Sequence, residues 1–186
     1  MVEDTKSVKR VAFLVSAEGI ERAELVEPWT AVTDAGHQAV LVSPANGEVQ
    51  LFEHLDKADA RPVDLTVAQA SVGDFDALVL PGGVANPDAL RTDAAAVALV
   101  RAFVESGLPV AAICHAPWTL IEADVVRGRD MTSYPSVSTD LKNAGATWHD
   151  QEVVVCTSAP STFVTSRNPD DLPAFNAAIV ETFAAA

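Results

Sequence analysis

Short apolar runs alternate with segments of helical periodicity along this chain of 186 residues. The runs 11–15, 38–42, 76–80 and 109–113 are almost wholly apolar, which predicts strands buried on both faces. Shorter strands are expected at 131–134, 152–156 and 163–166. Apolar residues recur at helical spacing in the segments 20–35, 92–105, 117–123, 137–144 and 168–183. This alternation predicts a single α/β domain whose mainly parallel sheet is covered by helices on both faces.

Turn-forming residues set the expected boundaries. Gly36 is expected to end the first helix, and Pro28 must kink that helix or mark its real start. Thr92 is expected to cap the helix at 92–105, with Asp93 in its first turn. The segment 48–66 has no long period and predicts a small excursion such as a hairpin. The segment 84–90 has neither a helical nor a strand period and is expected to be an exposed, partly apolar loop.

Composition narrows the class of protein. The balance of 12 Lys and Arg against 26 Asp and Glu gives a formal net charge of −14, which repels nucleic acid and anionic membranes. No apolar run approaches the ~20 residues that cross a bilayer, and the N-terminus lacks an apolar signal region. We therefore expect a cytoplasmic domain spanning 1–186 with a tail at 1–9. Neither of the two cysteines lies in a metal-type spacing, so neither a metal nor a cofactor is expected.

Cys114 follows the strand predicted at 109–113 and precedes a helix that begins near Pro117. This placement puts the thiol at the carboxyl end of a parallel strand, where open α/β sheets bind ligands. It also puts the thiol at a helix N-terminus, where the dipole favours the thiolate. Cys114 is therefore the candidate nucleophile, the alternative being a small buried core thiol.

A second loop at a strand end is formed by Pro-Gly-Gly at 81–83. If the two strands are neighbours, the backbone amides of Gly83 and His115 are natural donors to an oxyanion. The alternative is a pair of unrelated tight turns. His115 adjoins the candidate nucleophile, but sequence adjacency alone does not make a catalytic dyad.

Carboxylates near the first strand are spaced three residues apart, which indicates one helical face. These are Glu18, Glu21, Glu24 and Glu27. A solvated stripe explains most of them, and one could instead reach the strand ends and hydrogen-bond the thiol. Asp88 is a further candidate, with a plain position near a helix start as its alternative. His37, His54 and His149 are read as isolated, and Cys156 as a packing or edge thiol.

Taken together, these residues resemble the PfpI family of intracellular cysteine proteases and protein deglycases, within the ThiJ/PfpI superfamily. The resembling segments occur in order and almost end to end: 74–83, 107–117, 127–129, 132–135, 143–145, 152–155 and 165–167. The resemblance implies a flavodoxin-like three-layer sandwich with a nucleophile elbow. It also implies a homodimer or higher homo-oligomer with shared active sites.

Carried over by position, the resemblance makes Cys114 the nucleophile and His115 its histidine. Glu24, four residues before Pro28, would be the carboxylate that touches the thiol, and Glu21 a second acidic position. Asp88 would complete a triad across a subunit interface.

The same resemblance assigns Gly83 and His115 to the oxyanion hole and Tyr134 to the pocket lining. Three departures bear on specificity or activity. Ala116 replaces a glycine after Cys-His, Asp88 is shorter than the Glu of some members, and the segment 156–161 replaces a shorter Asp-Gly turn.

The function expected from the sequence is a cysteine-dependent hydrolase acting on peptides, glycated amino groups or small 2-oxoaldehydes. A class I glutamine amidotransferase would need a late His-x-Glu pair, whereas His149 is followed by Asp150 and Gln151. An alternative from another class is a non-catalytic stress protein, acting as a thiol redox sensor or a holdase chaperone.

Overall fold

The structure, a computed structural model, describes residues 7–186. The predicted tail at 1–9 lies mostly outside the described residues. The strands are β1 (Arg10–Leu14), β2 (Glu18–Glu21), β3 (Gln38–Ser43), β4 (Glu48–Glu53), β5 (Asp56–Pro62), β6 (Leu65–Thr66), β7 (Ala77–Leu80), β8 (Val110–Ile113), β9 (Asp130–Met131), β10 (Thr147–Trp148), β11 (Val153–Cys156) and β12 (Phe163–Ser166). The α-helices are α1 (Arg22–Asp34), α2 (Ala85–Leu90), α3 (Ala94–Glu105), α4 (Pro117–Glu122), α5 (Ser138–Asn143) and α6 (Leu172–Ala184).

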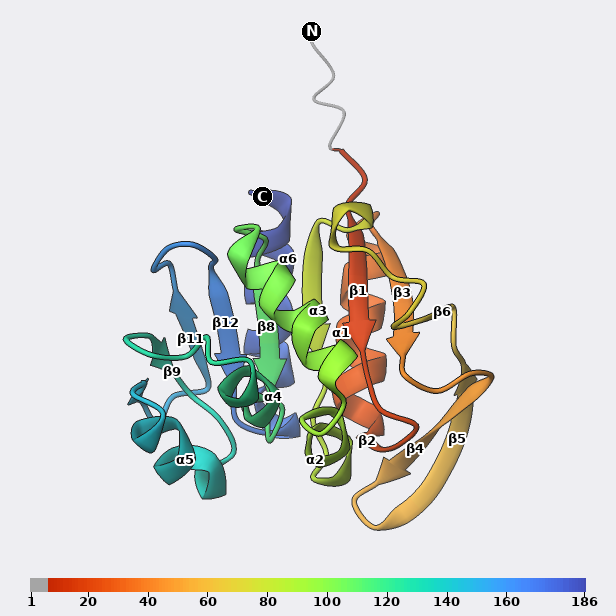
Figure 1. The fold of residues 1–186 in the computed structure, drawn as a ribbon, viewed down its shortest axis with the longest axis horizontal. Coiled ribbons are helices and arrows are strands. Elements are labelled where there is room, and N and C mark those ends of the chain that lie inside the picture. Colours follow the sequence, from red (N-terminus) through yellow and green to blue (C-terminus); the bar gives the residue numbers. More distant parts are fainter. Residues whose placement is uncertain (1–6) are drawn as a thin grey trace, which may run out of the picture.

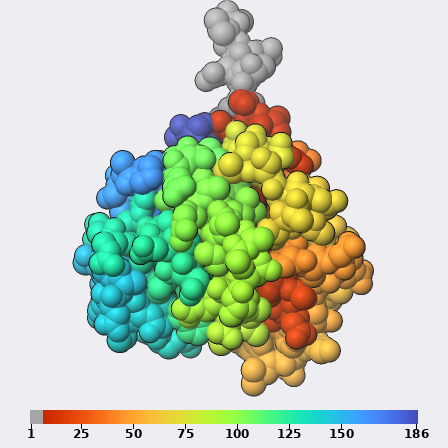
Figure 2. Space-filling model, in the orientation of Figure 1, coloured from red at the N-terminus to blue at the C-terminus, as the bar shows by residue number. Residues whose placement is uncertain are grey.

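The central sheet has seven strands in the order β11-β12-β8-β7-β1-β3-β6. All neighbouring pairs in it are parallel except β11 with β12. Helices α1 and α6 lie on one face, while α3, α4 and α5 lie on the other (Figure 1). In the space-filling view the green segment containing α3 covers the middle of its face (Figure 2). This is the three-layer, flavodoxin-like sandwich expected from the sequence.

Successive residues of the central strands point to opposite layers. In β1, Ala12 and Leu14 join the core under α3 and α4, whereas Val11 and Phe13 join the core under α1 and α6. All four are fully buried. A strand buried on both faces reads as a continuous apolar run, which is why these strands are visible in the sequence.

A second, smaller sheet joins β2, β4 and β5. Strands β4 and β5 form an antiparallel hairpin in the segment 48–66, as the missing long period predicted. The hairpin projects from one side of the molecule (Figure 1). Its strand β4 pairs with β2, which leads directly into α1.

Two local expectations were wrong, and one of the two alternatives for Pro28 is excluded. The segment 84–90 contains the helix α2, which is too short to show a period. Asp93 caps α3, because its side chain accepts a hydrogen bond from the Ala96 amide at 2.8 Å. Pro28 lies inside α1 and does not mark its start.

Candidate active site

Cys114 lies at a sharp turn between β8 and α4. Its φ is 64°, in the left-handed region that non-glycine residues rarely adopt. Pro117 occupies the start of α4, where its missing amide hydrogen is not needed. The Cys114 Sγ lies 3.1 Å from Nδ1 of His115, so the two neighbouring side chains do face each other. The turn therefore presents a thiol and an imidazole together at the carboxyl end of the sheet.

The glycine loop lies beside this turn because β7 pairs in parallel with β8. A Cβ at Gly82 would lie 2.2 Å from a Glu24 carboxyl oxygen and 2.6 Å from the Cys114 Cβ, so only glycine fits. Burial raises the pKa of Cys114, and the nearby backbone amides of Gly83 and His115 act against this rise. The expectation that the two strands are neighbours is confirmed.

Glu24 reaches the same point from the first turn of α1. Its side chain is fully buried, and neither carboxyl oxygen makes a well-aligned hydrogen bond within the described chain. Burial raises the pKa of Glu24 to about 8, against weaker lowering effects from the Cys114 thiol and the amides of the glycine loop. Glu24 therefore carries its proton in most molecules at neutral pH.

The thiol is also shifted toward its protonated form. Burial raises the pKa of Cys114, and a negative charge on Glu24 would raise it further. Both effects oppose the lowering of the thiol pKa that was predicted from its position at a helix N-terminus. Because the two groups interact, the pair loses its first proton as a unit. The proton that remains is then shared between the sulfur and the carboxyl group until the last proton is lost.

His115 is held by three neighbouring side chains. Its ring stacks on Tyr134 at 4.6 Å between centroids and meets Trp118 edge-on at 5.1 Å. Its Nε2 lies 3.2 Å from the Ser136 hydroxyl. Burial lowers the pKa of His115, which favours the neutral imidazole. A neutral ring can accept a proton from the thiol.

A pocket of about 680 Å³ opens over Cys114 and His115. Its wall contains Glu21, Asp88 and Tyr134. Glu21 accepts a hydrogen bond from the His54 amide at 3.1 Å. Asp88 is exposed on the wall, and the partner of His115 Nε2 within the chain is Ser136.

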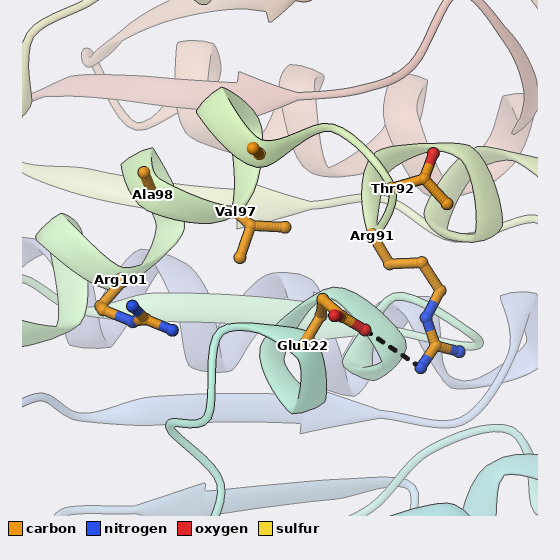
Figure 3. A pocket seen from close by; sticks show the side chains of 7 residues that line it. Arg91, Thr92, Val97, Ala98, Arg101 and Glu122 are labelled. Atoms are coloured by element: carbon orange, nitrogen blue, oxygen red, sulfur yellow. Dashed lines mark hydrogen bonds and ion pairs between the residues drawn. The ribbon is translucent and has the colours of Figure 1, made fainter.

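A second hollow, of about 480 Å³, lies between α3 and α4. It is lined by Arg91, Thr92, Ala94, Val97, Ala98, Arg101 and Glu122. Figure 3 shows Arg91 paired with Glu122 at 3.5 Å across it. It contains no cysteine, serine or histidine. The candidate site is therefore the pocket over Cys114.

Sequence reasoning placed some residues differently. The four glutamates do not share a helical face, because Glu18 and Glu21 lie in β2 and only Glu24 and Glu27 lie in α1. Ser136 was not singled out, and His54 was read as isolated although it lines the pocket. Within 7–186, no group of three or more His, Cys, Asp or Glu side chains is arranged to hold a metal ion.

The fold and this site define a three-layer α/β protein with a cysteine at a sharp strand-to-helix turn. The model of the DJ-1/PfpI family matches residues 9–182. "Protein/nucleic acid deglycase 2" of Escherichia coli is 43% identical over 169 residues, covering 90% of this chain and 94% of the relative. "Deglycase PfpI" of Pyrococcus furiosus is 40% identical over 166 residues, with 89% and 94% covered.

Solved structures agree with this assignment. Drosophila melanogaster DJ-1beta superposes with a TM-score of 0.82 at 27% identity, covering 97% of this chain and 92% of the other. This chain therefore belongs to the DJ-1/PfpI family. No helix of residues 7–186 is long and apolar enough to cross a bilayer.

Proposed function

We propose that this protein is a cysteine-dependent hydrolase of the PfpI type, acting as a protein deglycase or peptidase. The observation that carries the proposal is the surroundings of the Cys114 sulfur. It faces an imidazole nitrogen at 3.1 Å, a fully buried carboxyl group and two backbone amides. These are the groups that covalent catalysis at a carbonyl carbon needs: a nucleophile, proton carriers and oxyanion donors.

In the proposed reaction the Cys114 sulfur adds to the substrate's carbonyl carbon as its proton passes to His115. The oxygen that becomes negative is stabilised by the amides of Gly83 and His115. Because Glu24 carries its proton, no carboxylate charge stands beside the negative charge that forms at the reacting atoms. With an amide substrate the C–N bond then breaks, the amine leaves with the proton held by His115, and water hydrolyses the remaining thioester to a carboxylic acid and the free thiol.

The pocket wall fits a small carbonyl group borne on an amine or a peptide. Phe52, Leu55 and Tyr134 supply apolar surface around the polar groups at the base. The relatives' name, deglycase, supports glycated amino groups as the substrate class. Small 2-oxoaldehydes such as methylglyoxal present the same reactive carbonyl.

Asp88 acts across a subunit interface in this proposal. It stands exposed on α2 at the pocket wall, close to Val84, which is 57% exposed. An exposed apolar residue beside a site is typical of a contact surface. In a homodimer or larger homo-oligomer, Asp88 of one chain would orient His115 of the next, as a carboxylate orients a catalytic histidine.

Two free cysteines support a reducing, cytoplasmic location.

Turnover of methylglyoxal, of methylglyoxal-treated peptides and of a casein-type peptide tests the proposal. Wild type should act on at least one, and Cys114→Ser should lose at least about 10³-fold in kcat. Cys156→Ser is the matched control and should retain turnover. Equal turnover by wild type and Cys114→Ser, or none by wild type, would favour the non-catalytic stress protein instead.

A further inference from the structure

Ser136 is held in place by its own short segment. It lies in the 3₁₀-helix Pro135–Val137, where the Val137 amide donates a hydrogen bond to the Tyr134 carbonyl at 2.9 Å. Val137 is fully buried, which anchors the segment in the core. The Tyr134 amide in turn donates to the backbone carbonyl of Cys114 at 2.8 Å. The Ser136 hydroxyl is therefore tied to the backbone of the turn that carries the sulfur.

The two ring nitrogens of His115 face different groups. Nδ1 lies 3.1 Å from the Cys114 sulfur, and Nε2 lies 3.2 Å from the Ser136 hydroxyl. No other side chain in the part of the chain that the structure describes hydrogen-bonds either nitrogen. The ring is held between Tyr134, on which it stacks, and Trp118, which it meets edge-on. One edge of the imidazole is thus fixed toward the thiol and the other toward the hydroxyl.

The hydroxyl contact bears on which nitrogen carries the proton. A neutral imidazole has one N–H, so one nitrogen donates and the other accepts. In the proposed reaction Nδ1 of His115 takes the thiol proton, which requires the N–H to be on Nε2. The Ser136 oxygen is placed to accept from that N–H. Because Ser136 is exposed, its own hydrogen can be donated to solvent while a lone pair faces the ring.

We propose that Ser136 is a positioning residue: it accepts a hydrogen bond from Nε2–H of His115 and so keeps Nδ1 free to take the proton of Cys114. When that proton moves from sulfur to Nδ1, both ring nitrogens become donors, and the same Ser136 oxygen stabilises the resulting imidazolium. When the proton leaves with the amine, the ring returns to its starting tautomer. The effect on turnover rests on the proposed function, whereas the tautomer can be measured without substrate.

This role is confined to one chain. The Ser136 oxygen accepts from the ring, so its own hydrogen stays available for water or for the Asp88 carboxylate of a neighbouring chain. A hydrogen bond passed on in this way would connect that carboxylate with His115 through the hydroxyl. The effect of Ser136 is therefore expected whether or not the interface forms.

The tautomer is measured by ¹⁵N NMR of the full-length, reduced protein with labelled histidine rings at pH 7.5. The His115 signals are assigned by their loss in His115→Gln. We expect the Nε2–H tautomer in wild type and a larger share of the Nδ1–H tautomer in Ser136→Ala. Nδ1–H as the main form in wild type, or an unchanged tautomer in Ser136→Ala, would overturn the proposal.

Turnover gives the second readout. Loss of one hydrogen bond that strengthens during the reaction should lower kcat of Ser136→Ala about tenfold and leave KM nearly unchanged. Ser136→Thr keeps the hydroxyl and should restore most of the loss. Ser138→Ala is the matched control, since it begins α5 and its hydroxyl makes no hydrogen bond within residues 7–186.

The outcomes separate this inference from the proposed function. Equal kcat values for Ser136→Ala and Ser138→Ala, or no rescue by Ser136→Thr, would refute a role of the hydroxyl. If wild type turns over no substrate, the proposed hydrolase fails. The tautomer of His115 in wild type and in Ser136→Ala then decides the inference alone.

Discussion

The two cysteines of this chain are almost equally buried, at 7% and 4% exposure, yet their surroundings have opposite character. Burial raises the pKa of the Cys114 thiol, and the nearby carboxyl group of Glu24 adds to this rise. At Cys156 burial acts to raise the pKa of the thiol, but hydrogen bonds with Ser158 and Asp130 and the charge of Arg129 outweigh it, and the pKa is lowered. Similar exposure therefore goes with opposite shifts of the thiol pKa, because burial is the largest effect at Cys114, whereas hydrogen bonds and the charge of Arg129 together outweigh burial at Cys156.

The largest effect is expected from filling the space between Cys114 and Glu24. In Gly82→Ala the new Cβ would overlap both groups, so the turn or the carboxyl group must move. A small displacement at reacting atoms can reduce the rate by about 10²-fold. We expect at least that loss of turnover.

Gly73→Ala is the matched control for this substitution. A Cβ there meets nothing within 4 Å. Equal activities of the Gly82 and Gly73 variants would show that the close approach of Glu24 to the turn is unimportant.

A second difference between the two cysteines concerns their neighbours. Those of Cys156 all come from its own chain, whereas the Cys114 site, as proposed, also needs Asp88 of another chain. Asp88→Ala should lower turnover about 10²-fold, because His115 loses its orienting carboxylate. Mixing it with Cys114→Ser should restore about a quarter of wild-type activity in a dimer, since half of the dimers are mixed and each has one intact site.

Light scattering measures the oligomeric state, and turnover assays measure the activity of the mixture. A monodisperse, active monomer, or full activity of Asp88→Ala alone, would instead leave Asp88 as a residue of the first turn of α2. Its effect would then be limited to about 1 kcal/mol of stability.

The last comparison concerns the free energy of unfolding and the raised pKa of Glu24. A carboxyl whose folded pKa is raised stabilises the folded state below its ordinary pKa of 4.5, and this stabilisation is lost as the pH rises toward about 8. Glu24→Gln has no proton to lose. Its free energy of unfolding should therefore gain on that of wild type by up to about 1.4 kcal/mol per pH unit across this window.

Urea unfolding at pH 5, 6, 7 and 8 measures the difference. Glu21→Gln is the control, because Glu21 lies in the pocket wall with its side chain 13% exposed. Parallel stability curves for wild type and Glu24→Gln would mean that Glu24 is not held in its protonated form.

Much of the fold could be predicted from the sequence because its strands are buried on both faces. Continuous apolar runs identified β1, β3, β7 and β8, and the glycines after α1 and α3 marked their ends. The short helix α2 escaped because six residues cannot show a period. The strand β2 escaped because three of its four residues are two glutamates and a glycine, with Ile20 as the sole buried residue.

The candidate site was predicted in part. Cys114 and His115 were visible from a strand, a turn and Pro117, and the glycine loop from its composition. The choice of Glu24 among four glutamates came from resemblance. Their spacing could not reveal that two of the four lie in β2 and not in α1. The contrast between the thiols was not visible at all, because Arg129 lies 27 positions before Cys156 in the printed chain. Only the fold brings them together.

The hairpin β4–β5 offers a route to redesign. Phe52, His54 and Leu55 line the pocket from this hairpin, which belongs to the small sheet, while Cys114 and Gly83 follow strands of the large one. Leu55 is 94% exposed, so its side chain can be exchanged with little effect on packing. Under the proposed function, substrate range and bond-making chemistry would be encoded in separable parts of the chain. A library restricted to the tip of this hairpin would vary what the pocket accepts without disturbing the groups around the sulfur.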